Sequence, residues 1–172
     1  MKKQRKFTVM TITYASFFIG LSVVINTLRI GNLSFSGFPI IFSGYVLGPV
    51  MGFVVGLLAD ILAFIVRPAG FPFNPVFTFT SALTGMIPVL ITTILGDDYP
   101  DYKFWKILIG VFIGQVITSV IMTPYLMSVI YGKYTFWYLM IQSAIKQAVS
   151  IPIYAVLIKI VWDRMKYIVH ID

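Results

Sequence analysis

Residues 48–75 of the chain read GPVMGFVVGLLADILAFIVRPAGFPFNP. After the opening Gly-Pro the stretch is apolar up to Arg67 except for Asp60, and it is long enough for one helical crossing of a bilayer. Three prolines then restrict the backbone from Arg67 to Pro75, so we expect this loop to hold an extended shape between two spans. Its arginine, asparagine and two phenylalanines can bind a flat polar solute, and an ordinary helix-to-helix turn is the alternative.

The composition is typical of an integral membrane protein. Only 11% of the residues are charged and 59% are hydrophobic, whereas roughly a quarter of a soluble domain is charged. Cysteine and glutamate are absent and His170 is the one histidine, which leaves little material for acid-base, nucleophilic or metal chemistry. We therefore expect an all-α membrane protein that is not an enzyme and that uses no metal or cofactor. The basic residues behind the net charge of +7 are spread along the chain, which argues against a nucleic-acid surface.

At about 20 residues per crossing, the chain divides into six predicted spans within one integral membrane domain over residues 1–172. The spans are 8–28, 38–47, 49–66, 76–95, 105–130 and 137–162. The second is short, and the count of six depends on it. Six spans place eight basic residues on the side of the termini and three, Arg29, Arg67 and Lys133, on the other. Because cytoplasmic loops carry an excess of Lys and Arg, we expect both termini to be cytoplasmic.

Small residues recur at helical spacing inside the spans. Gly48, Gly52 and Gly56 precede Asp60 at four-residue intervals, which places all four on one helical face and lets a neighbouring helix approach closely. Two further pairs have this spacing, Gly110 with Gly114 and Ala144 with Ala148. Helix packing is the simplest explanation of all of them.

Two charged residues fall inside predicted spans, where charge is costly. Asp60 and Lys146 can form a buried ion pair that fixes the register of two helices. Alternatively, Lys146 lines a solute pocket together with Gln142 and Gln147. At the outer surface, an anionic ligand would first meet the cations Arg29, Arg67 and Lys133. Alternatively, these cations only mark the ends of helices at the lipid headgroups.

Other features bear on chemistry. Aromatic residues gather toward the outer half, which indicates either an interfacial belt or a stacking pocket for a flat heterocycle. The inner loop carries three carboxylates, Asp97, Asp98 and Asp101. They form a site for Mg²⁺ or Ca²⁺, or they only keep this loop solvated. The chain has no phosphate-loop motif, so ATP-driven transport would require another subunit.

The motif Arg67-Pro-x-Gly-Phe-Pro-Phe-Asn-Pro-x-Phe-Thr-Phe-Thr-Ser-Ala-Leu-Thr-Gly85-x-Ile-Pro88 follows the glycine stripe that ends at Asp60. With the small six-span design, it resembles the substrate-binding S components of energy-coupling factor (ECF) vitamin transporters, most closely the folate-specific S component. The resemblance implies a six-helix bundle with an outward-facing cavity that captures folate at the bacterial cell membrane. It also implies docking to a membrane-embedded T subunit and two ATPases.

The resemblance further suggests site residues. A pterin and an aminobenzoyl group favour aromatic stacking and an amide, and a glutamate tail favours the outer cations. The predicted substrate-binding residues are Arg29, Arg67, Phe71, Phe73, Asn74, Tyr125, Gln142 and Lys146. Family members carry Ala-x-x-x-Ala on the first span for docking, and the nearest match here gives Ala15, Ser16 and Gly20 as the docking residues.

Three other functions stay open on the sequence. The chain can be an S component for another vitamin or a queuine-like base, which a panel of ligands would reveal. It can be an intramembrane lipid enzyme that uses a metal at Asp97, Asp98 and Asp101, or a structural subunit that binds no small molecule.

The arginine of the loop gives a first testable expectation. Arg67→Ala should weaken folate binding far more than it disturbs the fold, because a guanidinium can hold a carboxylate through two hydrogen bonds. Folate titration of the purified variant measures this, and an unchanged affinity would remove Arg67 from the site.

Overall fold

The computed structural model describes residues 8–28, 35–68, 70, 72–96, 101–132 and 135–165, and helices are the regular secondary structure within these ranges. The helices are α1 (Val9–Thr27), α2 (Gly37–Leu47), α3 (Pro49–Val66), α4 (Pro75–Ile94), α5 (Phe104–Gln115), the π-helix η1 (Val116–Met122), α6 (Thr123–Tyr131) and α7 (Phe136–Met165). Because α5, η1 and α6 follow one another without a break, they form one continuous rod. With this rod counted once, five described helices are long and apolar enough to cross a membrane.

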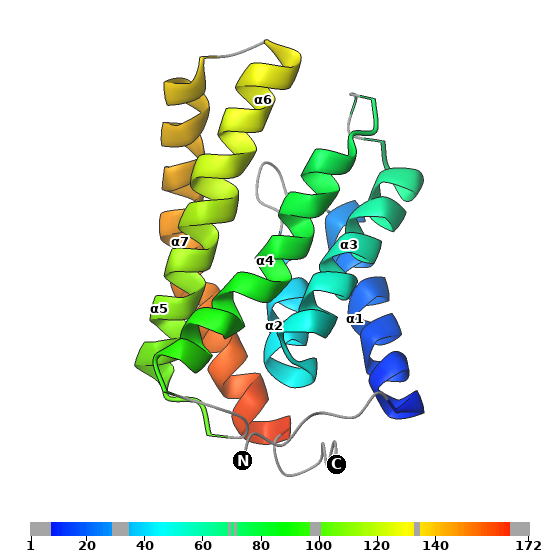
Figure 1. The fold of residues 1–172 in the computed structure, drawn as a ribbon, viewed down its shortest axis with the longest axis vertical. Coiled ribbons are helices and arrows are strands. Elements are labelled where there is room, and N and C mark those ends of the chain that lie inside the picture. Colours follow the sequence, from blue (N-terminus) through cyan, green and yellow to red (C-terminus); the bar gives the residue numbers. More distant parts are fainter. Residues whose placement is uncertain are drawn as a thin grey trace.

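With the short α2 included and the α5–η1–α6 rod counted once, successive helical segments run in alternating directions through the bundle (Figure 1). The beginning of α1 and the end of α7 lie at one end, which is the lower end in the view. The ends of α3 and α6 lie at the opposite, upper end. This arrangement agrees with the predicted spans, whose bounds differ from those of the helices by only a few residues.

Helix α2 is too short to cross the bilayer by itself. Its 11 residues span about 16 Å at the usual rise, whereas the hydrocarbon core is about 30 Å thick. Residues 39–47 are all buried, and α2 packs against α1, α3, α4 and α7. The segment predicted as a short span is therefore an internal helix that is enclosed by protein along most of its length.

A tight turn joins α2 to α3. Gly48 has a φ of 98°, a region that glycine enters without the steric cost of a Cβ atom. Pro49 occupies the first turn of α3, where its missing N–H would have no helical partner. The Gly-Pro pair thus reverses the chain within one residue and starts the next helix.

The glycine stripe of α3 packs directly on α4, as predicted. A Cβ atom built on Gly52 would collide with the backbone of Gly85, and one on Gly56 would collide with the backbone at Ser81 and Ala82. Gly44 of α2 meets the same carbonyl of Gly85. Three helix backbones therefore converge at Gly85.

The later pairs of small residues behave differently from each other. Gly110 and Gly114 of α5 pack against Pro88 of α4, so this pair is a packing site as predicted. Ala144 and Ala148 of α7 are exposed, and the packing role predicted for this pair is wrong within the described structure. Spacing alone defines a helical face but not the partner of that face.

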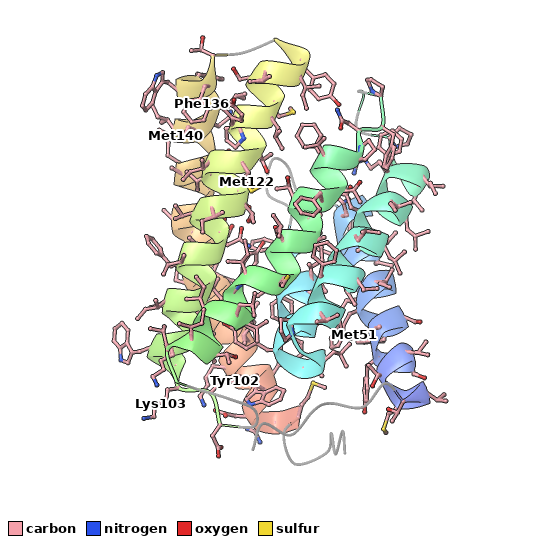
Figure 2. All side chains as sticks on the ribbon, viewed as in Figure 1. Met51, Tyr102, Lys103, Met122, Phe136 and Met140 are labelled. Carbon is pink, nitrogen blue, oxygen red and sulfur yellow. The ribbon has the colours of Figure 1, made fainter. Side chains whose placement is uncertain are left out.

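The lower half of the bundle is filled by large side chains. The Tyr45 hydroxyl lies 2.8 Å from Oγ1 of Thr92, and the Tyr45 ring makes an edge contact with Tyr102. Tyr102 in turn contacts Trp162, which is almost fully buried. Figure 2 shows Tyr102 at the lower end of the molecule, whereas Phe136 and Met140 mark the upper part of α7.

The convergence at Gly85 leads to a stability prediction. Gly52→Ala should lower the free energy of unfolding by about 2 kcal/mol or more, because the new methyl group would overlap backbone that cannot rotate away. Thermal denaturation in detergent, followed by tryptophan fluorescence, measures the effect. Gly20→Ala is the control, since a Cβ atom there meets nothing within 4 Å and alanine favours the helix. Equal melting temperatures for Gly52→Ala and the unaltered protein would contradict the packing argument.

Candidate ligand-binding site

A cavity of about 310 Å³, lined by both polar and apolar groups, lies between the α3–α4 pair and the helices η1 and α7. Its volume is at the lower end of the range of about 300–1,000 Å³ that is usual for small-molecule pockets. It is lined by Ser36, Gly37, Ile40, Asp60, Phe77, Thr80, Ser81, Thr84, Gln115, Ser119, Thr123, Gln147 and Tyr154. Residues from every helix except α1 therefore meet around one space.

Asp60 of α3 is the one charged residue among the described lining residues. The hydroxyl of Thr78 donates to Oδ2 at 2.8 Å, and the hydroxyl of Ser81 donates to Oδ1 at 2.9 Å. Both donors come from α4, which the glycine stripe brings close to this face of α3. The stripe therefore determines where the carboxylate lies and which side chains hold it.

Two further hydroxyl groups of α4 line the cavity. Thr80 donates to the carbonyl of Val76 and Thr84 donates to the carbonyl of Thr80, each at 3.0 Å. A threonine hydroxyl has one proton and two lone pairs, so a group that has donated its proton can still accept. These side chains present acceptor oxygens to the cavity.

The opposite wall includes an irregular stretch of helix. Gln115, Ser119 and Thr123 repeat at four-residue intervals across η1 and line the cavity together. The Ser119 hydroxyl lies 2.6 Å from Oε1 of Gln115, and Thr123 donates to the carbonyl of Thr118 at 2.8 Å. Pro124 lacks an N–H and so removes one helical hydrogen bond directly after the π-helix. Such a π-helix is common at functional sites.

Gln147 of α7 contributes an unpaired acceptor. Its Oε1 atom is buried and has no hydrogen-bond partner within the described part of the chain. A buried polar atom without a partner costs free energy, about 1–3 kcal/mol. A donor on a bound molecule would remove this cost.

Aromatic and apolar side chains complete the lining. The ring of Phe77 stacks on that of Tyr131, with centroids 5.8 Å apart and an interplanar angle of 11°. The Tyr131 hydroxyl donates to the carbonyl of Pro72 at 3.1 Å and so connects the end of α6 to the loop before α4. Tyr154 and Ile40 add flat and aliphatic surface. The cavity thus combines hydrogen-bonding groups with faces for a ring.

Comparison with known proteins assigns this architecture to a family. The family model described as "ECF transporter, substrate-specific component" matches residues 10–168. The chain belongs to this family of S components. Its sequence is also 28% identical over 163 residues to a protein named Folate transporter FolT from Clostridium novyi (strain NT), covering 89% of this chain and 90% of the relative. The protein is therefore a multi-pass membrane transport component and not an enzyme.

The described loop residues of this S component have structural partners outside the cavity. Arg67 donates from Nη1 to the carbonyl of Thr27 at 2.8 Å and joins the ends of α1 and α3. Oδ1 of Asn74 accepts from the N–H of Val76 at 3.0 Å and caps the start of α4. Phe73 lies against Phe64, with ring centroids 5.3 Å apart. None of these three loop residues lines the cavity.

The other described residues of the predicted substrate-binding set also lie outside the lining of the cavity. Tyr125 and Gln142 are exposed, Lys146 is partly exposed, and none of the three is among the lining residues. Arg29 and Phe71 lie outside the described residues, as does Lys133. None of the six described residues of the predicted binding set is therefore among the residues that line this cavity.

The ion pair expected between Asp60 and Lys146 is not formed. Asp60 is bonded to Thr78 and Ser81 of the neighbouring helix, and the described salt bridge of α7 joins Lys159 to Asp163 at 2.9 Å. Gln147 lines the cavity in place of Lys146. One residue along a helix rotates the side chain by about 100°, which separates these two positions.

Most of the polar lining was missed by the analysis of the sequence. The missed groups include Thr80, Thr84, Ser119 and Thr123. A usable signal was present, because hydroxyl and amide residues recur every three or four positions within otherwise apolar spans. Such a polar stripe in a membrane helix faces protein or a cavity, since lipid offers it no partner.

The remaining sequence predictions concern docking and metals. Ser16 and Gly20 are exposed on α1, whereas Ala15 is buried, so only the first two are on the open face of that helix. Among the described residues, no group of three or more His, Cys, Asp or Glu could hold a metal ion. Asp101 is exposed, and Asp97 and Asp98 lie outside the described residues.

The cavity can be probed chemically because the chain has no cysteine. Ser119→Cys should react with a small charged methanethiosulfonate reagent, since its side chain lines the cavity and the reagent needs access to a thiolate. Ser43→Cys should stay unmodified, because Ser43 is fully buried in α2 and donates to the carbonyl of Ile40. Mass spectrometry of the intact protein counts the adducts. An unreactive thiol at position 119 would show that the cavity is closed to solvent.

Proposed function

We propose that this S component captures folate from outside the cell and that the described cavity is its binding site. The relative named Folate transporter FolT matches the chain over nearly its full length and supports the choice of ligand. The cavity supports it independently, because it combines a ring-sized space, aromatic faces and a carboxylate. The single observation that carries the proposal is the convergence of polar side chains from α3, α4, the α5–η1–α6 rod and α7 on that cavity.

We infer the topology and partners from the same family membership. In this proposal both termini lie in the cytoplasm, α2 is an internal segment, and the cavity opens toward the outside of the bacterial cell membrane. The excess of basic residues on the side of the termini supports this orientation. Uptake then requires docking to a T subunit and two ATPases, because the chain carries no phosphate loop of its own.

A second candidate ligand is favoured by one observation. A single carboxylate and no cation stand among the described lining residues, which suits an uncharged, donor-rich base as well as a vitamin. A nucleobase-like solute is therefore the alternative substrate, and the same binding experiment separates the two.

The proposal is tested by titrating the purified protein with folate, thiamine, riboflavin, biotin and queuine, with calorimetry as the readout. Folate should bind with one site per chain and the other compounds should bind weakly or not at all. Thr84→Phe should lower the folate affinity by about tenfold or more, since overfilling a packed site costs about 1–3 kcal/mol. Thr84 lines the cavity and its hydroxyl bonds only to its own helix, so little else is lost.

Thr93→Phe is the matched control for this variant. Thr93 lies on the same helix but is not among the lining residues. Preference for another ligand in the panel would contradict the folate assignment. Equal folate affinities of Thr84→Phe and Thr93→Phe would instead place the ligand outside this cavity.

A further inference from the structure

Most hydroxyl protons around the cavity are already used inside the protein. Thr80, Thr84 and Thr123 donate to backbone carbonyls, and Ser81 donates to the Asp60 carboxylate. The lone pairs of these oxygens remain available to a bound molecule. The wall formed by α3 and α4 is therefore rich in acceptors, and it favours a ligand whose buried edge carries N–H groups.

Asp60 is the strongest of these acceptors. Each of its two oxygens receives one hydroxyl, from Thr78 and from Ser81, whereas a carboxylate has about four acceptor positions in total. The hydroxyls hold the carboxylate in one orientation and leave one position open on each oxygen. Two parallel N–H donors on a ligand can occupy both positions at once.

Gln147 supplies an acceptor from a different wall. Helix α3 packs on α1, α2 and α4, whereas α7 packs on α2, α5, α6 and η1, so the two residues approach the cavity from separate parts of the bundle. The unpaired Oε1 of Gln147 needs a donor that the described part of the protein does not provide. A flat ligand with adjacent N–H groups can donate to Asp60 and to Gln147 at the same time.

We propose that Asp60 and Gln147 recognise the donor edges of a 2-amino-4-oxo heterocycle, which enters the cavity first. In such a ring the N3–H and the 2-amino group form two adjacent, parallel donors that match the Asp60 carboxylate. Gln147 Oε1 accepts the second N–H of the same 2-amino group. This inference rests on the proposed folate function and assigns the pterin as the buried part of the ligand.

The charge of the cavity agrees with this orientation. No lysine or arginine is among its described lining residues, and Asp60 would repel an anionic group placed beside it. The two carboxylates of a glutamate tail therefore remain at the mouth of the cavity. In this orientation the pterin determines which ligand is bound, and the glutamate tail adds affinity through contacts at the outer surface of the protein.

The test uses the purified full-length protein and two ligands, folic acid and a folate analogue in which a methyl group replaces the 2-amino group. The unaltered protein should prefer folic acid by about tenfold or more, as expected for a hydrogen bond to a charged acceptor. Asp60→Asn should lower the affinity for folic acid by about tenfold to a hundredfold. It should also bring the ratio of the affinities for folic acid and the analogue closer to 1. Gln147→Met should lower the affinity for folic acid by about twofold to tenfold.

Asp163→Asn is the matched control, because Asp163 pairs with Lys159 on α7 and is not among the lining residues. It should leave both affinities unchanged. Equal affinities of the unaltered protein for the two ligands would overturn the inference even if Asp60→Asn fails to fold. A full preference that survives in Asp60→Asn would overturn it as well. In both cases folic acid still binds, which distinguishes this failure from a failure of the folate assignment, where folic acid would not bind at all.

Discussion

The close contact between the backbones of α3 and α4 at Gly52 and Gly85 is the constraint on which the structure depends. Side chains larger than hydrogen at either position would separate the two helices, and Gly44 brings α2 into the same contact. In a bilayer the hydrophobic effect gives little force for helix association, so such close packing supplies much of the attraction. The position of Asp60 follows from this contact, since it lies on the same face two turns beyond Gly52.

The carboxylate of Asp60 would be costly inside a membrane protein without partners. The α3–α4 contact solves this problem by bringing the hydroxyls of Thr78 and Ser81 within hydrogen-bond distance of both oxygens. The hydroxyl protons of α4 are thus donated within the protein, and the lone pairs of these oxygens remain available to the cavity. Packing, polar satisfaction and ligand preference are therefore consequences of one arrangement of helices.

The described residues of the loop from Arg67 to Pro75 make contacts with the ends of neighbouring helices. Arg67 and Asn74 bond to backbone at the ends of helices, and Tyr131 donates to the carbonyl of Pro72. These bonds attach the described loop residues to α1, α4 and α6. These contacts stabilise the helix ends, while nearly all described residues that line the cavity lie on the helices.

Several features could be predicted from the sequence because they depend on local spacing. The helical spans follow from apolar length, the turn at Gly48-Pro49 from backbone chemistry, and the α3 packing face from the four-residue glycine repeat. The predicted Asp60–Lys146 pair failed because it required the relative rotation of α3 and α7, two helices far apart in the chain. Periodicity gives the face of one helix, but it contains no information about the neighbour of that face.

The sequence by itself determined a helical membrane protein, the extent of its helices and the glycine contact, since each of these depends on residues within one segment. Only the tertiary structure decided that Gln147 and not Lys146 faces the cavity, and that Thr80, Thr84 and Ser119 share it with Asp60. The physical reason is that a cavity is the space left between several helices. Its lining depends on their mutual rotations and distances, which packing of the whole bundle sets.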